Sequence, residues 1–215
     1  MRIDRSGIPF IVCSIVPAAT LFVLDRPGWA LVLGTLAAVF AFFFRAPDRW
    51  VPDVPHGVVS PADGRILYAD AADPSAAPEG AWQQISIFLS PLDVHVNRIP
   101  IGGHVTRVSH KGGRFLPAYR QEAASENEQC EVWIEHQGQT IVFRQVVGLL
   151  ARRVVCRLVP EMDVAVGERF GIMKFGSRMD IYVPLSAKLH ASVGDVVRGG
   201  ETVLATLVDS SALDS

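Results

Sequence analysis

The stretch "KLHASVGDVVRGGETVLATL", residues 188–207, decides the fold. Short apolar and β-branched segments alternate in it with two turn signals, Gly194-Asp195 and the Gly199-Gly200 pair. Glycine adopts positive φ without steric cost, which tight turns between antiparallel strands require. The stretch therefore predicts three short strands joined by two turns.

The chain before this stretch has the same character. Apolar, β-branched segments separated by Gly, Pro and Asp recur after residue 50, among them "GVVSPADGRILYA", "WQQISIFLS", "CEVWIEH" and "RMDIYVPL". This spacing predicts an all-β domain. Both the tail and "VVSPADGRI", residues 58–66, resemble the sequence style of biotinyl- and lipoyl-type barrel-sandwich domains. We expect one mainly β, barrel-sandwich-like domain built from both halves of the chain.

One segment departs from the strand pattern. Residues 111–129, "KGGRFLPAYRQEAASENEQ", are polar and carry a weak helical period across residues 118–128. A long loop inside a compact domain is more often functional than idle.

Two almost uncharged runs, residues 8–24 and 29–44, precede the β pattern. At 1.5 Å per helical residue each reaches roughly 25 Å, slightly short of the roughly 30 Å hydrocarbon core of a bilayer. A hydrophobic helical hairpin that spans or only inserts is therefore expected. A cleaved signal peptide and ordinary buried helices are the alternatives. The second run follows immediately after Asp25-Arg26-Pro27-Gly28 and is apolar on every face, which favours the hairpin.

Positive charges lie at both ends of this hairpin, with only Arg26 in its turn. The flanking arginines are Arg2, Arg5, Arg45 and Arg49. The positive-inside rule then places both ends in the cytoplasm, with the β domain on the cytoplasmic side of the cell membrane.

The segment "RAPDRWVPDVP", residues 45–55, is rich in proline and charge and predicts a linker. We expect residues 1–50 to form the membrane-associated hairpin and linker. Residues 51–215 are expected to form the β-rich catalytic domain.

Composition excludes several classes of partner. The formal net charge is -2 and the pI about 6.3, so no nucleic-acid partner is expected. Cys13, Cys130 and Cys156 are odd in number and widely spaced, which fits a reducing compartment better than a disulfide scaffold or zinc site. No metal is expected, because most histidines form no metal-ligand spacing: His56, His104, His110, His136 and His190.

The stretch most informative about function is "GERFGIMKFGSRMDIYVP", residues 167–184. A Gly-Ser pair alone is common, but here other motifs accompany it in order: "FFFRAPDR", "VVSPADGRI", "FLSPLDVHVNRIP", "GGRFLPA", "ASENEQ" and "KFGSRMDIYVP". Together they cover nearly the whole chain. This set resembles the phosphatidylserine decarboxylase family, in the short bacterial and archaeal form. Longer members carry Leu-Gly-Ser-Thr at the cut, where this chain has Phe175-Gly176-Ser177-Arg178.

The resemblance implies a proenzyme that cuts itself between Gly176 and Ser177. The products would be a larger β chain, residues 1–176, and a smaller α chain, residues 177–215, held together as a heterodimer or a higher oligomer. Ser177 would become a covalent pyruvoyl group, which forms a Schiff base with the substrate amine and replaces a dissociable cofactor. The implied reaction converts phosphatidylserine, a phospholipid of the membrane, to phosphatidylethanolamine and carbon dioxide.

The chemistry requires a base near the serine, because a hydroxyl is a poor nucleophile until its proton is removed. His95, in "SPLDVHVNRIP", is the leading candidate, since imidazole exchanges protons near neutral pH. Asp63, in "SPADG", is expected to orient that ring, completing a Ser-His-Asp arrangement like the family's processing triad. Longer members carry a second histidine three places after the one matching His95, and Arg98 stands there. Without the motifs, Asp63 and His95 would be read as an ordinary turn residue and a structural histidine.

The lipid phosphate calls for a cation. Lys174, Arg98 and Arg114 are the candidates, although each also fits an ordinary solvated surface charge.

Two functions without catalysis remain as alternatives. "IMKF", residues 172–175, resembles the Met-Lys of biotinylated hairpins, so a membrane-tethered barrel-sandwich carrier would have Lys174 modified and the chain intact. A membrane-tethered adaptor would also keep the chain intact, but no heptad pattern of the kind such adaptors usually insert occurs here.

Overall fold

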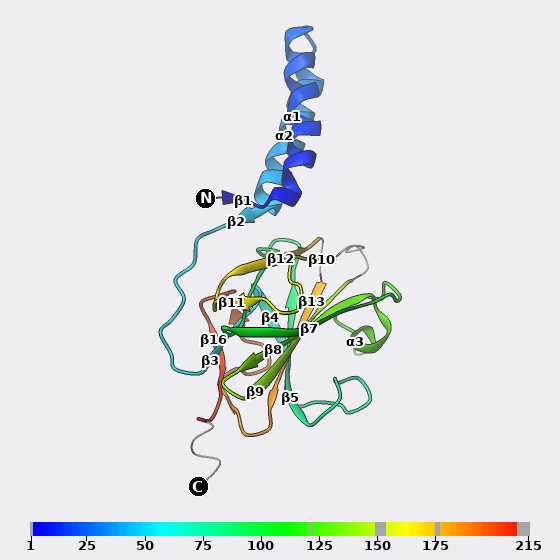
Figure 1. Cartoon of the computed structure of the whole chain (residues 1–215). Helices are drawn as coiled ribbons and strands as arrows, with labels where there is room; N and C mark the ends of the chain where they lie inside the picture. Colours follow the sequence, from blue (N-terminus) through cyan, green and yellow to red (C-terminus); the bar gives the residue numbers. More distant parts are fainter. Residues whose placement is uncertain (1, 121, 149–153, 175–176, 210–215) are drawn as a thin grey trace. The chain divides into compact units, whose positions relative to one another are not determined.

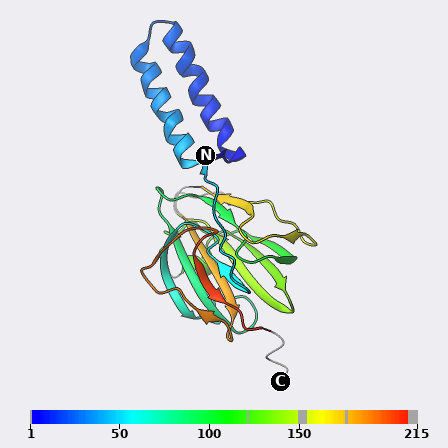
Figure 2. The same cartoon turned by 90° about the vertical axis from the view of Figure 1, so that its left-hand side faces the viewer.

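The computed structural model describes residues 2–120, 122–148, 154–174 and 177–209. It divides into two compact units, Met1–Asp48 and Arg49–Ser215 (Figures 1 and 2). The first unit is helical and the second is mainly β.

The first unit is the expected pair of apolar helices. α1 (Ile8–Val23) and α2 (Pro27–Phe43) run antiparallel after a 3-10 turn, η1 (Arg5–Gly7). The short strands β1 (Arg2–Ile3) and β2 (Arg45–Ala46) pair at its base. The helical stretch Arg5–Val23 is long and apolar enough to cross a membrane, and α2 is a shorter apolar helix.

Packing between the two helices is aromatic. The Phe10 ring lies 5.4 Å from that of Phe40 and 5.4 Å from that of Phe44. Gly7 allows this close approach, since a Cβ there would lie 2.4 Å from Phe44. Large apolar side chains on the outer faces are exposed, among them Val23, Trp29 and Leu31.

The second unit contains a curled antiparallel sheet of eight strands in the order β11-β7-β8-β9-β13-β5-β4-β15 (Figure 1). The bounds of its strands are β4 (Gly64–Ala71), β5 (Trp82–Leu89), β7 (Gly103–Lys111), β8 (Gln129–His136), β9 (Gln139–Val146), β11 (Asp163–Val164), β13 (Ser177–Pro184) and β15 (Val196–Val197). One of its two central strands is β13, which pairs with β9 on one side and β5 on the other.

Two three-stranded sheets complete the β domain. One has the order β10-β12-β6, with the bounds Val154–Cys156, Arg169–Met173 and Val96–Arg98. The other has the order β14-β16-β3, with the bounds Lys188–Leu189, Val203–Thr206 and Gly57–Val59. Because β16 and β15 from the tail pair with β3 and β4 from the start, the domain is built from both halves of the chain, as the sequence predicts.

The core lies inside the curl of the large sheet. Side chains alternate across a strand, so Met179, Ile181 and Val183 of β13 join the core while Arg178 and Asp180 face the other side. Each fully buried aliphatic side chain stabilises the fold by about 1.5–3 kcal/mol relative to exposure.

The long polar segment has little regular structure. Its weak helical period corresponds to one short helix, α3 (Ala123–Glu126). The buried Asn127 side chain fixes the segment, because its amide bonds to the backbone of Leu116 and Val147.

Candidate active site

The expected cleavage site lies where the chain passes from one sheet to another. Met173 ends β12 in the three-stranded sheet, and Ser177 begins β13 in the eight-stranded sheet. Gly176, the other half of the expected bond, lies outside the described residues. Sites of chemistry in β proteins are commonly found at such connections.

Ser177 is completely buried. It pairs with Leu89 of β5. Its side chain lies on the same face of β13 as the core residues Met179 and Ile181. Within the described part of the chain its Oγ has no hydrogen-bond partner. A buried hydroxyl without a partner costs about 1–3 kcal/mol. A group kept in that state at a sheet junction is a candidate nucleophile.

His95 lies beside the same junction. A loop, residues 90–94, connects Leu89 to His95. Leu89 is the register partner of Ser177. The His95 carbonyl accepts a hydrogen bond from the Met173 N–H at 3.2 Å. Both ends of this short loop are therefore tied to the residues that flank the expected cut. The histidine side chain is fully buried.

The loop also fixes the tautomer of His95. Its Nδ1 lies 3.0 Å from the Asp93 carbonyl oxygen, an acceptor, so Nδ1 carries the proton and the neutral ring has its lone pair at Nε2. A turn holds Asp93 in place: its N–H donates to the Ser90 carbonyl at 2.9 Å, and its carboxylate accepts from the Ser90 N–H at 2.7 Å. Pro91 suits the second position of that turn.

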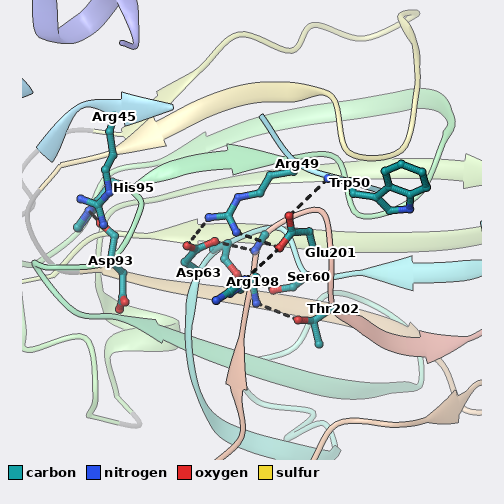
Figure 3. A network of polar contacts seen from close by, with 12 residues as sticks. Arg45, Arg49, Trp50, Ser60, Asp63, Asp93, His95, Arg198, Glu201 and Thr202 are labelled. Atoms are coloured by element: carbon teal, nitrogen blue, oxygen red, sulfur yellow. Dashed lines mark hydrogen bonds and ion pairs between the residues drawn. The ribbon is translucent and has the colours of Figure 1, made fainter. Parts of the chain in front are cut away.

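The hydrogen-bond partners of Asp63 are an arginine and a turn N–H, so its part in the expected triad stays a prediction. Its Oδ2 accepts from Arg49 Nη2 at 2.6 Å, and its Oδ1 accepts from the Gly199 N–H at 2.7 Å. Figure 3 shows Asp63 directed at these partners and well separated from His95. An arginine and a turn N–H from the tail satisfy both oxygens of the Asp63 carboxylate, while a backbone carbonyl, that of Asp93, lies at Nδ1 of His95.

Arg49 is the centre of this second network (Figure 3). Its side chain is only 10% exposed and also lies 3.1 Å from Glu201, whose other oxygen accepts from the Trp50 N–H at 3.4 Å. The network ties the start of the β domain to the turn around Gly199. From sequence, Arg49 was seen only as a charge that follows the hairpin.

Asp63→Asn tests this structural role. The substitution keeps an oxygen for the Gly199 N–H but removes the charge facing Arg49, so we expect the free energy of unfolding to fall by about 1–3 kcal/mol. Arg49→Met should have a similar effect, and the double variant should lose less than the sum. Thermal unfolding in detergent measures the loss, while a gel should show the chain still cut. An Asp63→Asn protein of normal stability that fails to cut would instead place Asp63 in the chemistry.

The three phosphate candidates differ in environment. Arg98 is buried and donates through Nη1 to the Gly167 carbonyl at 2.8 Å. Arg114, with a side chain 73% exposed, forms a surface ion pair with Glu126 at 3.1 Å. Lys174 is half-buried and lies two residues before Gly176, the first residue of the expected cut. Lys174 is thus the candidate next to the junction.

A cavity lies on the other face of β13. It measures about 550 Å³ and is lined by Tyr68, Tyr119, Glu122 and Arg178, among others. Arg178 bonds there to Asp180 at 2.6 Å and to Ser86 at 2.9 Å. Because Ser177 has the opposite parity, its side chain points away from this cavity.

A buried serine and a buried histidine thus flank the place where the chain passes from one sheet to the other. Comparison with known proteins gives the class. Residues 36–205 match the family model described as phosphatidylserine decarboxylase.

Relatives of similar length agree. A phosphatidylserine decarboxylase proenzyme from Desulfotalea psychrophila is 40% identical over 96% of this chain and 97% of its own. Proenzymes of the same name from Wolbachia pipientis wMel and Salinibacter ruber are 41% and 45% identical, over 96% and 83% of this chain and 91% and 79% of theirs. The protein is a decarboxylase. It belongs to the phosphatidylserine decarboxylase family.

Proposed function

We propose that this protein cuts itself between Gly176 and Ser177, converts Ser177 to a pyruvoyl group, and then decarboxylates phosphatidylserine to phosphatidylethanolamine. The observation that carries the proposal is the buried Ser177 Oγ, which has no partner within the described part of the chain and lies at the first position of β13, beside His95. The relatives' description as proenzymes supports processing.

The buried position of Ser177 next to Gly176 supports the following route for self-cleavage. Attack of Ser177 Oγ on the Gly176 carbonyl carbon forms an ester and frees the Ser177 nitrogen as an amine. Loss of the Ser177 Cα proton then expels the Gly176 carboxylate from Cβ and leaves dehydroalanine. Water replaces the nitrogen, and ammonia departs. The products are chains 1–176 and 177–215, the second with a pyruvoyl group at its start.

We assign the base to His95. The Asp93 carbonyl holds its Nδ1 proton, so Nε2 is the atom that would accept the proton from the Ser177 hydroxyl. The two are not hydrogen-bonded in the uncut chain, so they must first come within hydrogen-bond reach. We assign Asp63 a supporting role, through Arg49 and the Gly199 turn.

The surroundings of Ser177 fit a small covalent group. Leu89 and Met179 beside it are fully buried and exclude water. The ketone of a pyruvoyl group would supply an electron sink for the electrons that carbon dioxide leaves behind. His95 is again the residue positioned to return a proton to the substrate carbon.

The lipid substrate is proposed from the family and from the apolar helices. The hairpin would hold the β domain at the cytoplasmic side of the cell membrane, and Lys174 would contact the lipid phosphate. Release of labelled carbon dioxide from carboxyl-labelled phosphatidylserine in micelles tests the substrate. We expect release from the lipid and very little from free serine at equal concentration. Equal release from both would contradict the lipid assignment.

Deleting residues 1–44 should separate anchoring from chemistry. The β domain is a compact unit that starts at Arg49, so we expect it to cut itself without the hairpin. Turnover on phosphatidylserine in vesicles should fall, because the anchor supplies local concentration and not catalytic groups. A gel measures cutting and labelled carbon dioxide measures turnover. A truncated chain that folds but stays uncut would show that the hairpin takes part in the site.

A further inference from the structure

Two buried amides join the sheets beside the expected cut. Gln145 of β9 donates from Nε2 to Oδ1 of Asn97 of β6 at 2.8 Å, and both side chains are fully buried. β9 belongs to the eight-stranded sheet and β6 to the three-stranded sheet, so this bond crosses the interior of the domain.

Each amide has hydrogen-bonding capacity left over. Among the described residues, Asn97 Nδ2 and Gln145 Oε1 have no partner. If both amides were turned by half a rotation, the free donor would belong to Gln145 and the free acceptor to Asn97. Either way the pair presents one N–H donor and one carbonyl acceptor. A buried donor or acceptor without a hydrogen-bond partner costs about 1–3 kcal/mol. We therefore expect a further group to bind the free donor and the free acceptor of this pair.

The pair lies in the layer next to Ser177. Gln145 is the register partner of Met179 on β13. Ser177, two residues earlier on the same face, is therefore a diagonal neighbour, at a distance long side chains can span. Asn97 follows His95 by two residues and pairs with Gly171 of β12. The amide pair thus has the serine on one side and the histidine on the other.

The backbone makes room for these amides. A Cβ at Gly171 would lie 2.9 Å from Gln145 Nε2 and 2.3 Å from the Val155 carbonyl. Cys130, the register partner of Gln145 on β8, fills the same layer. Its hydrogen bond to Cys156, together with burial, raises the pKa of the Cys130 thiol, which keeps this neighbour uncharged. The side chain directly opposite Gln145 on β8 is thus uncharged.

We propose that the Asn97–Gln145 pair recognises the amino-acid headgroup of the substrate, its free N–H binding the carboxylate that will leave and its free carbonyl binding the amine. This assignment rests on the proposed function. Neutral amides suit the task because a full positive charge would stabilise the carboxylate of the ground state more than a transition state that is losing it. The pair therefore distinguishes the substrate from its product, which lacks the carboxylate.

Short-chain phosphatidylserine and phosphatidylethanolamine test this discrimination without a membrane. Cyanoborohydride couples a bound lipid amine to the ketone of the small chain, and intact mass counts all adducts. We expect the cut wild-type protein to couple the serine lipid about 10- to 100-fold better than the ethanolamine lipid. This factor corresponds to the free energy of one hydrogen bond to a charged group. Gln145→Met and Asn97→Leu should still cut and couple the ethanolamine lipid, with most of that preference lost.

Gln129→Met is the matched control. Gln129 is also buried with a partnerless Oε1 among the described residues, but its parity places it on the opposite face of the sheet from Cys130. This variant should keep the wild-type preference. Asn97→Asp nearly keeps the shape of the side chain, so it is a second variant that should not disturb folding. Its carboxylate should repel that of the serine lipid, so its preference for the serine lipid over the ethanolamine lipid should be lower than that of Asn97→Leu.

The outcomes are distinct. Variants at Asn97 and Gln145 that cut normally and retain the preference would overturn the assignment. Variants that fold, by an unchanged melting temperature, but stay uncut would also overturn it, because the pair would then serve self-cleavage. Failure of the wild-type protein to cut would instead contradict the proposed function.

Discussion

Replacing Ser177 by alanine is expected to leave a single uncut chain of 215 residues that releases no carbon dioxide from phosphatidylserine. A methyl group cannot attack the Gly176 carbonyl, so neither the new chain end nor the pyruvoyl group can form. The buried position accepts alanine without strain, because Oγ has no partner to lose among the described residues. A gel reports the cut and labelled carbon dioxide reports the activity.

Two companion variants sharpen this test. Ser186→Ala removes an exposed hydroxyl beyond the far end of β13 and should cut and turn over normally. Ser177→Cys should cut slowly, since a thiol can make the same acyl shift. A cleaved and active Ser177→Ala protein would overturn the whole account.

Replacing His95 by alanine should slow both self-cleavage and decarboxylation, and the loss of decarboxylation should be the more complete of the two. Without a general base the rate of proton removal from Ser177 falls by a factor of order 10² to 10⁴. Cleavage needs one turnover, so some cut protein can accumulate over hours of expression. Decarboxylation needs many turnovers, so we expect little carbon dioxide from the fraction that has matured. The cut fraction on a gel and carbon dioxide release per cut molecule keep the two roles apart.

His190→Ala is the control. His190 is exposed and its hydrogen-bond partner is Thr206 in the tail, so this variant should cut and turn over normally. If His95→Ala cuts fully and turns over normally per cut molecule, His95 is structural, and Asp63 or Arg98 must be reconsidered as the base or its helper.

Much of the fold could be predicted from the sequence, because its signals are local. The glycine turns of the tail, the alternating strand segments and the two uncharged runs each specify their own element. The pairing of tail and start was expected from their shared barrel-sandwich style, and the register of Val203 with Val59 confirms it. The long polar loop was less predictable, since the buried amide of Asn127 organises it and not a periodic pattern.

The site was harder to predict because its contacts are between distant segments. The motif "SPADG" is compatible with a catalytic carboxylate, but Arg49 and Gly199 satisfy Asp63. Sequence cannot reveal that a backbone carbonyl, that of Asp93, orients His95. Asn97 and Gln145 gave little signal, because β6 and β9 contain other polar residues such as Arg98 and Arg144, and the burial of both amides depends on contacts between distant strands.

The most direct test of the central claim is the intact mass of the purified protein. The account predicts two chains, residues 1–176 ending in an ordinary carboxylic acid and residues 177–215 lacking one ammonia at the start. That mass identifies the pyruvoyl group without assuming any substrate. A single unmodified chain, a chain carrying an added biotin at Lys174, or a small chain with an unmodified Ser177 would contradict it.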